Sequence, residues 1–317
     1  MFNPAAYLRT LKATYIINNL LHYRKLAGNR KFYRKYGLKK PVFAPVSSRD
    51  FAGVPAEIPW LDRPDAKESL QSNAEFLAFS PEIQQKIISW IDHGYIILEQ
   101  FFSREMVESV NREVDQLISG KKVEFHPSGR IMFAYRQSQL LQQIANDPEL
   151  IRLMSFLTGK TMATFQSINF IKGSEQRAHS DSIHMTTFPP GYLTAIWLAL
   201  EDIDEKNGGL IYYPGSHKLP YIMNEDFQHG GGYFRLGENA NRSYEDKIES
   251  LIRSHQLKPA TFVAAPGDLL IWHANLIHGG QPIQVPGSTR KSMVMHYFAE
   301  DVFCYHELTQ RPALIEK

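Results

Sequence analysis

The chain has 317 residues and a mass of 36.4 kDa, which is enough for one large domain or two modest ones with a substantial core. Hydrophobic residues make up 43% and charged residues 21%, proportions that exclude a fibrous, low-complexity or disordered chain. Aromatic residues reach 12%, which suits a protein with a lined pocket.

Charge is distributed unevenly along the chain. Residues 1–48 contain ten Lys or Arg and no Asp or Glu, which leaves 25 basic against 33 acidic residues in the remainder. We expect no nucleic-acid partner, because a domain that binds phosphates needs a basic face of its own. The basic head is a candidate for contact with an anionic membrane surface near a lipid-linked or CoA-type substrate. Packing on the body or a dimer contact is the alternative.

The single cysteine, Cys304, excludes an intrachain disulfide and a cysteine-rich zinc site. A reducing, cytoplasmic setting is therefore expected, with peripheral membrane association as the variant that the basic head allows. The apolar stretch 15–21 is short and is interrupted by Asn18 and Asn19, so we expect neither a signal peptide nor a transmembrane helix.

The first 60 residues differ in character from the rest. Propensities favour helix over 4–36, and a proline-rich stretch then continues to about Pro64. We predict a basic helical extension with a proline-rich strap over 1–60 and a main domain over 61–317.

Helices precede strands in the main domain. Capping signals predict helices from Ser80 to Gly94, from Ser103 to just before Gly120, and from Asp147 to Gly159. Short β-branched or alternating runs follow at 163–171, 194–200, 209–213, 261–264, 268–273 and 292–298. This order predicts an α+β chain whose second part is a sandwich or barrel.

Among twelve histidines, only His179 stands in a His-x-Asp pattern, with Asp181. Spacing i, i+2 puts both side chains on one face of an extended segment. An imidazole, a carboxylate and a second imidazole form the triad that leaves positions on Fe(II) open for other ligands. A His-x-Asp pair also arises by chance, so a structural histidine is the alternative for this dipeptide.

A second cluster supplies the missing groups. His278 ends an apolar run just before two glycines, and Arg290 begins the next predicted strand. A guanidinium binds a carboxylate through two parallel charge-assisted hydrogen bonds, and Ser292 would share its face of the strand. The alternatives are a satisfied core histidine for His278 and a surface ion pair for Arg290.

Several ordered motifs carry a family resemblance. They are Gly-Tyr-Ile-Ile-Leu at 94–98, Phe-Phe-Ser at 101–103, Trp-Leu-Ala-Leu-Glu-Asp-Ile-Asp at 197–204, Asn-Gly-Gly-Leu at 207–210 and Pro-Gly-Ser-His at 214–217. Over about 94–298 the chain resembles the phytanoyl-CoA dioxygenase family of Fe(II)- and 2-oxoglutarate-dependent oxygenases. The resemblance implies a double-stranded β-helix, a cupin-like jelly roll, with N-terminal helices packed on one sheet.

The resemblance also implies roles for individual residues. His179, Asp181 and His278 would hold iron, and Arg290 would bind the distal carboxylate of 2-oxoglutarate. Gln166 and Trp197 match positions near the co-substrate. Gly280 departs from relatives that carry a hydroxyl residue there, which predicts a different arrangement of co-substrate contacts.

Other polar residues remain open. His273 is the rival of His278 as the distal ligand, and the family pattern favours His278. His184 is a candidate for facing substrate, with a structural role as the alternative, and His217 is expected to be structural. Tyr135 and Arg136 are candidates for the pocket entrance or for an ordinary surface role.

The resemblance implies an enzyme that uses Fe(II), 2-oxoglutarate and O2 to hydroxylate an aliphatic carbon of a small molecule, with release of succinate and CO2. A secondary metabolite or a lipid-linked or acyl-CoA-type molecule is the expected substrate. The carboxylate of Asp181 favours hydroxylation over halogenation, while desaturation, ring formation and epimerisation stay open.

The long segment 201–257 would be a lid or a plain connection. The competing function is a non-catalytic jelly roll that binds a small ligand or carbohydrate and keeps a vestigial metal site. Substrate identity and oligomeric state are left open.

Overall fold

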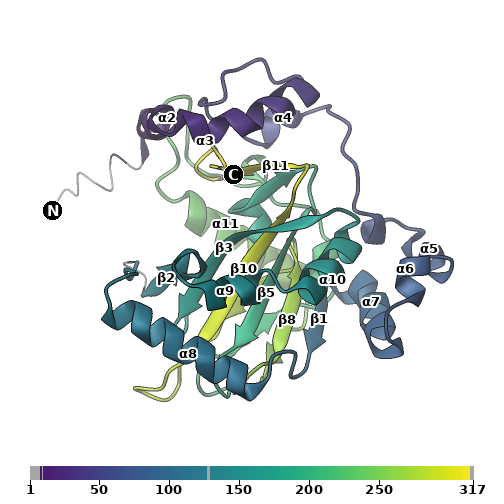
Figure 1. The fold of residues 1–317 in the computed structure, drawn as a ribbon. Helices are drawn as coiled ribbons and strands as arrows, with labels where there is room; N and C mark the ends of the chain where they lie inside the picture. The colour runs from purple at the N-terminus through teal and green to yellow at the C-terminus, as the bar shows by residue number, and fades with distance from the viewer. Residues whose placement is uncertain (1–7, 9, 127–128, 315–317) are drawn as a thin grey trace.

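A sheet of six antiparallel strands crosses the centre of the molecule in this computed structural model, which describes residues 8, 10–126 and 129–314 (Figure 1). In spatial order its strands are β1 (Tyr95–Leu98), β8 (Leu269–His273), β5 (Leu193–Ala199), β10 (Ser292–Ala299), β3 (Met162–Phe170) and β2 (Arg130–Met132). Strand β5 is buried along its whole length, because Ile196 and Leu198 point to one face while Ala195 and Trp197 point to the other.

Two three-stranded sheets complete the β-structure. One has the order β7 (Ala260–Phe262), β6 (Leu210–Tyr212), β9 (His278–Gly280), and the other the order β12 (Arg311–Pro312), β11 (Phe303–His306), β4 (Thr186–Phe188). Tyr212 and Phe262 of the first small sheet share an apolar cluster with Trp197, Leu270 and Val294 of the large one. Two sheets that enclose a common core form the predicted jelly roll.

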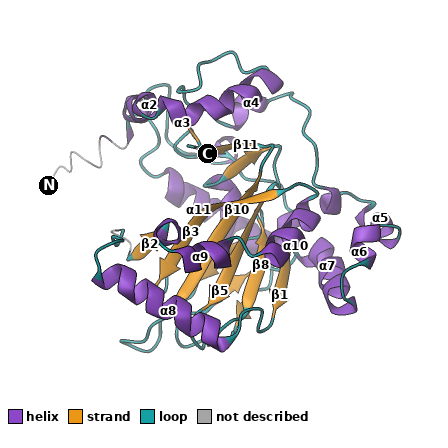
Figure 2. Cartoon of the chain, viewed as in Figure 1, coloured by secondary structure: helices purple, strands orange, loops and turns teal. Residues whose placement is uncertain are grey.

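Helices cover the other face of the large sheet and lie beside its β1 edge (Figure 2). They are α5 (Ala66–Gln71), α6 (Ala74–Leu77), α7 (Pro81–His93), α8 (Arg104–Ser119), α9 (Gln139–Ala145) and α10 (Pro148–Thr158). The predicted caps are in place, since the hydroxyl of Ser80 accepts a hydrogen bond from Ile83 N and that of Ser103 from Met106 N. Gly94 ends α7 in the left-handed region, with φ of 77°.

The N-terminal segment packs on the body. Helices α2 (Lys12–Leu21), α3 (Tyr23–Leu26) and α4 (Arg30–Lys35) lie beside β11 at the top of Figure 1. Phe32, Tyr33 and Phe51 form a cluster with Phe188 and Phe303 of the body. The division near residue 60 stays a prediction. In the described part of the chain no helix is long and apolar enough to span a bilayer.

The sequence missed several elements. The helix predicted over 4–36 is interrupted at His22 and by a 3-10 turn, and its residues 4–7 and 9 lie outside the described residues. Helices α5, α6 and α9 and strands β2, β4, β9, β11 and β12 were not expected. Segment 201–257 is not a plain connection, because it contains α11 (Ala240–Ser254), whose Tyr244 and Ile248 are buried. The remaining short helices are 3-10 turns at Ala27–Asn29, Ser48–Phe51, Trp60–Asp62, Ala134–Gln137, Asp181–Ile183, Ser216–Lys218 and Asn224–Asp226.

Candidate metal centre and co-substrate pocket

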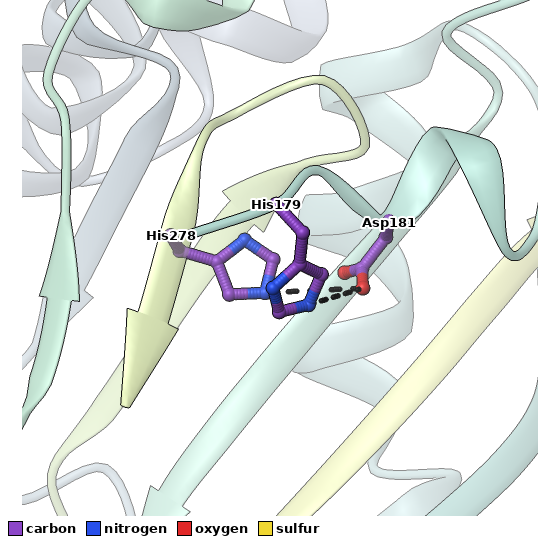
Figure 3. A group of neighbouring side chains, drawn as sticks. All are labelled: His179, Asp181 and His278. Atoms are coloured by element: carbon purple, nitrogen blue, oxygen red, sulfur yellow. Dashed lines mark ion pairs between the residues drawn. The ribbon is translucent and has the colours of Figure 1, made fainter. Parts of the chain in front are cut away.

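Two segments far apart in sequence meet at a pair of histidines. His179 lies between β3 and the turn Asp181–Ile183, and His278 is the first residue of β9. Their backbones exchange two hydrogen bonds, His179 N to His278 O at 2.9 Å and His278 N to His179 O at 2.8 Å. The side chains of His179, Asp181 and His278 therefore point toward one another (Figure 3).

The three side chains have the geometry of a metal site. The Oδ1 atom of Asp181 lies 3.9 Å from His179 Nε2 and 3.8 Å from His278 Nε2. Both distances are shorter than two metal–ligand bonds of about 2.1 Å each. One ligand atom from each residue lies within 4.8 Å of the others, and all three residues are buried. Two imidazoles and one carboxylate are the donor set that suits Fe(II).

Backbone carbonyls fix both imidazoles in one tautomer. His179 Nδ1–H donates to the carbonyl of Arg177 at 2.8 Å, and His278 Nδ1–H donates to that of Leu276 at 3.0 Å. Since a carbonyl oxygen only accepts, each Nε2 keeps its lone pair for a metal. Burial, with the neighbouring His278, lowers the pKa of His179 to about 4, so this imidazole is neutral at physiological pH.

The carboxylate of Asp181 is oriented by two further side chains. Trp272 Nε1–H donates to Oδ2 at 2.8 Å, and His296 Nε2 lies 3.6 Å from the same oxygen. Burial alone raises the pKa of Asp181, but His278, His296 and His179 hold it well below its usual range. Asp181 is therefore ionised, with Oδ1 directed at the two histidines.

A cavity of about 430 Å³ opens on the triad, and Gln166, Trp197 and Arg290 line it together with the three residues. The structure thus brings together six of the seven residues singled out in the sequence. Ser292 does not line the cavity. It is fully buried, and its hydroxyl has no hydrogen-bond partner among the described residues.

Arg290 is a buried cation with incomplete pairing. Only 1% of the residue is exposed, and Nη1 donates to the carbonyl of Gly208 at 2.6 Å. Within the described chain its Nε has no partner, and no carboxylate lies at ion-pair distance. Burial lowers the pKa of Arg290 to about 10, so the guanidinium stays charged at neutral pH. A buried charge of this kind needs an anion, and a carboxylate fits its donors.

Of the other residues considered in the sequence, some lie at the metal cavity and others lie elsewhere. His273 points away from the triad and lies 3.1 Å from Asp62 Oδ2, which leaves His278 as the residue beside Asp181. His217 packs edge-on against His273. Tyr135 and Arg136 line a different cavity, so they are not at the entrance of this one. His184 does line the metal cavity and contacts the rings of His179 and His306.

Helix α11 is tied to the strand segment that carries the triad. The guanidinium of Arg177 forms ion pairs with Glu245, Asp246 and Glu249 at 3.1, 2.7 and 2.6 Å. Ser180 N–H donates to the hydroxyl of Tyr244 at 2.9 Å. Helix α11 therefore stabilises the segment 177–181, which carries His179 and Asp181.

Sequence reasoning missed several residues of this site. Trp272 and His296 stand on predicted strands, and alternation from Arg290 puts His296 on the pocket face, so that signal was available. His306, Ser174, Arg130 and Asn241 also line the cavity. They come from four separate segments, and nothing local in the sequence connects them.

Oxygenases that use non-haem Fe(II) are the class in which a two-histidine, one-carboxylate triad leaves metal positions open. The family model of phytanoyl-CoA dioxygenase (PhyH) matches residues 90–292, more than half of the chain. The chain therefore belongs to the phytanoyl-CoA dioxygenase family of Fe(II)- and 2-oxoglutarate-dependent oxygenases, whose co-substrates are 2-oxoglutarate and O2.

Known proteins agree with this membership. The peroxisomal phytanoyl-CoA dioxygenase of Rattus norvegicus is 23% identical over 236 residues, which span 66% of each chain. The α-ketoglutarate-dependent carbocyclase SnoK from nogalamycin biosynthesis superposes with a TM-score of 0.56 at 15% identity over 72% of this chain and 87% of its own. EctD from S. alaskensis, solved with 2-oxoglutarate and 5-hydroxyectoine, gives 0.53 at 20% identity over 70% and 76%. At these identities the two structures establish the fold.

Proposed function

We propose that this protein is a dioxygenase that hydroxylates an aliphatic carbon of a small molecule and releases succinate and CO2. One observation carries the proposal: the buried guanidinium of Arg290, which forms no ion pair within the described chain, lines the same cavity as the His-Asp-His triad. A non-catalytic binding protein has no need for both features in one cavity.

Each residue has a distinct part in this proposal. His179, Asp181 and His278 hold Fe(II), and Arg290 binds the distal carboxylate of 2-oxoglutarate. When bound, the iron and co-substrate together supply the oxidising chemistry. Trp272 and His296 keep the Asp181 carboxylate turned toward the histidines. Gln166 and Trp197 border the co-substrate, and Ser292 has no part because it does not line the cavity.

Ser174 replaces the hydroxyl that Gly280 lacks. A Cβ atom on Gly280 would lie 2.9 Å from Ser174 Oγ, closer than real contacts allow. Both residues line the cavity, and Ser174 stands two residues from Gln176, which also lines it. We assign the serine hydroxyl as a contact of the co-substrate carboxylate from a different segment of the chain.

The rest of the cavity is suited to a polar, small substrate. His184, His306, Arg130 and Asn241 line it. Burial lowers the pKa of His184 well below its usual value and that of His306 to about 4, so both are neutral hydrogen-bonding groups. The volume of about 430 Å³ accepts a small metabolite, or the reacting end of a lipid-linked or CoA-linked molecule, beside the co-substrate.

The test is an anaerobic titration of the apoprotein with Fe(II) and then 2-oxoglutarate. A weak visible charge-transfer band is expected, absent from Asp181→Ala and weakened in Arg290→Ala. Succinate release then serves to screen candidate substrates. A folded wild-type protein that shows no band would refute the proposal in favour of a binding module with a vestigial site.

A further inference from the structure

The outward face of α2 is apolar, the reverse of an ordinary surface helix. Ile17, Leu20 and Leu21 are 59, 47 and 78% exposed, and Ala13 is exposed on the same side one turn earlier. The inward face carries Asn19, buried with its amide donating to the carbonyl of Phe43 at 3.0 Å. Residues at i, i+4 and i+8 form one stripe, so the exposed apolar side chains are contiguous.

A second exposed apolar pair is attached to this helix. Tyr233 and Phe234 are 87 and 76% exposed. Their loop is joined to the start of α2 through its backbone, since Lys12 N–H donates to Phe234 O at 3.1 Å and Leu236 N–H donates to Thr10 O at 2.7 Å. Large apolar side chains from two segments that are distant in sequence and joined through their backbones thus stay exposed, although burial in the body would stabilise the fold.

The segment that contains α2 also carries exposed cations. Arg24, Arg34 and Lys39 follow α2 along the chain, are exposed, and make no ion pair within the described ranges. No acidic residue occurs before Asp50, so nothing in this stretch of sequence neutralises them. A segment that combines exposed apolar side chains with exposed cations that form no ion pair is suited to a bilayer with anionic headgroups.

We propose that the apolar face formed by Ile17, Leu20, Leu21, Tyr233 and Phe234 binds an anionic lipid bilayer. Helix α2 lies parallel to the membrane plane, its apolar stripe enters the boundary of headgroups and acyl chains, and the cations contact the headgroups. The loop of Tyr233 and Phe234 leads directly into α11, whose Asn241 lines the metal cavity. If the proposed function holds, this arrangement brings the cavity close to a membrane-associated substrate, but lipid binding itself does not depend on catalysis.

The test is sedimentation of the full chain with vesicles of phosphatidylcholine and with vesicles that also contain roughly 30% phosphatidylglycerol. Wild type is expected to sediment with the anionic vesicles. Ile17→Ser/Leu21→Ser is expected to lower the bound fraction about fivefold or more, and Arg24→Glu/Arg34→Glu to remove the preference for phosphatidylglycerol. Leu77→Ser on α6 is the matched control, because this leucine is equally exposed at 59% but lies elsewhere.

Two outcomes would overturn the proposal. The first is wild type that stays in the supernatant with both kinds of vesicle. The second is a dimer, measured by light scattering, that Ile17→Ser/Leu21→Ser dissociates while vesicle binding is absent, since the apolar face would then belong to a second copy of the chain. Thermal unfolding of each variant shows that a loss of binding is not a loss of fold. Neither outcome changes the result expected from the titration with Fe(II) and 2-oxoglutarate, so the two proposals are tested independently.

Discussion

Trp272 and Asp181 are 91 residues apart in sequence, yet the indole N–H of Trp272 donates to Asp181 Oδ2 at 2.8 Å. Both residues are buried. This bond holds one carboxylate oxygen on the sheet side and leaves Oδ1 facing His179 and His278. Trp272, on strand β8, therefore fixes the orientation in which Asp181 offers its Oδ1 atom to a metal.

Replacing Trp272 by Phe removes this bond and keeps most of the packing volume. We expect Fe(II) affinity to fall by about 10- to 100-fold, because a ligand that loses its orienting partner rotates away from the metal. Anaerobic Fe(II) titration measures the change. Trp60→Phe is the control, since it also deletes an indole bond, to Phe156 O, but far from the triad. Equal iron affinities in the two variants would contradict the orienting role.

The triad could be predicted because its pattern is local. His179 and Asp181 are two residues apart, and His278 precedes a glycine pair at the end of an apolar run. Those glycines have a structural reason, since a Cβ on Gly279 would lie 2.9 Å from the carbonyl of Gln176. The close approach of the two chain segments that carry the ligands thus requires glycine next to His278, and this glycine can be recognised in the sequence.

Contacts between segments that are distant in sequence have no local pattern from which they could be predicted. The rings of His184 and His306 meet only because β4 and β11 pair. Helix α11 has a local signal in the sequence, since Tyr244, Ile248, Leu251 and Ile252 follow a helical period, whereas the expectation for 201–257 was a lid or a plain connection. Packing of the basic head on Phe188 and Phe303 depends on the finished fold.

We expect the hydroxyl group to be transferable from position 174 to position 280 only when both residues are changed together. Ser174→Ala should raise the KM for 2-oxoglutarate about 10-fold with little change in kcat, since one hydrogen bond to a carboxylate is lost. Gly280→Ser should be equally impaired, because its Cβ meets Ser174 Oγ. The double variant Ser174→Gly/Gly280→Ser returns a hydroxyl without the contact to Ser174 Oγ, and its remaining close contact, 3.2 Å to Glu175 N, requires only a small shift, so it should recover part of the affinity. Steady-state succinate formation gives these constants, and a double variant no better than Ser174→Ala would rule out the exchange.

Glu307 fastens the N-terminal segment to the body. Its Oε2 accepts from Ser48 N at 2.8 Å, and its Oε1 accepts from Ser48 Oγ at 2.9 Å and from Asn224 N at 3.3 Å. Glu307→Ala leaves these donors without their acceptor and should lower the free energy of unfolding by about 2 kcal/mol. Glu300→Ala, at an exposed position nearby in sequence, should change it little.

The loss at Glu307 should also depend on pH. Burial raises the pKa of this carboxyl despite the hydrogen bonds from Ser48 and Asn224. A raised folded-state pKa gives a contribution that is fully present below the unfolded-state value of about 4.3 and is lost as pH rises through the folded-state value. Urea unfolding of wild type and Glu307→Ala should therefore show a smaller difference at pH 8 than at pH 5. A difference that grows with pH would mean that the ionised carboxylate is the form the fold prefers, and that its hydrogen bonds outweigh its burial.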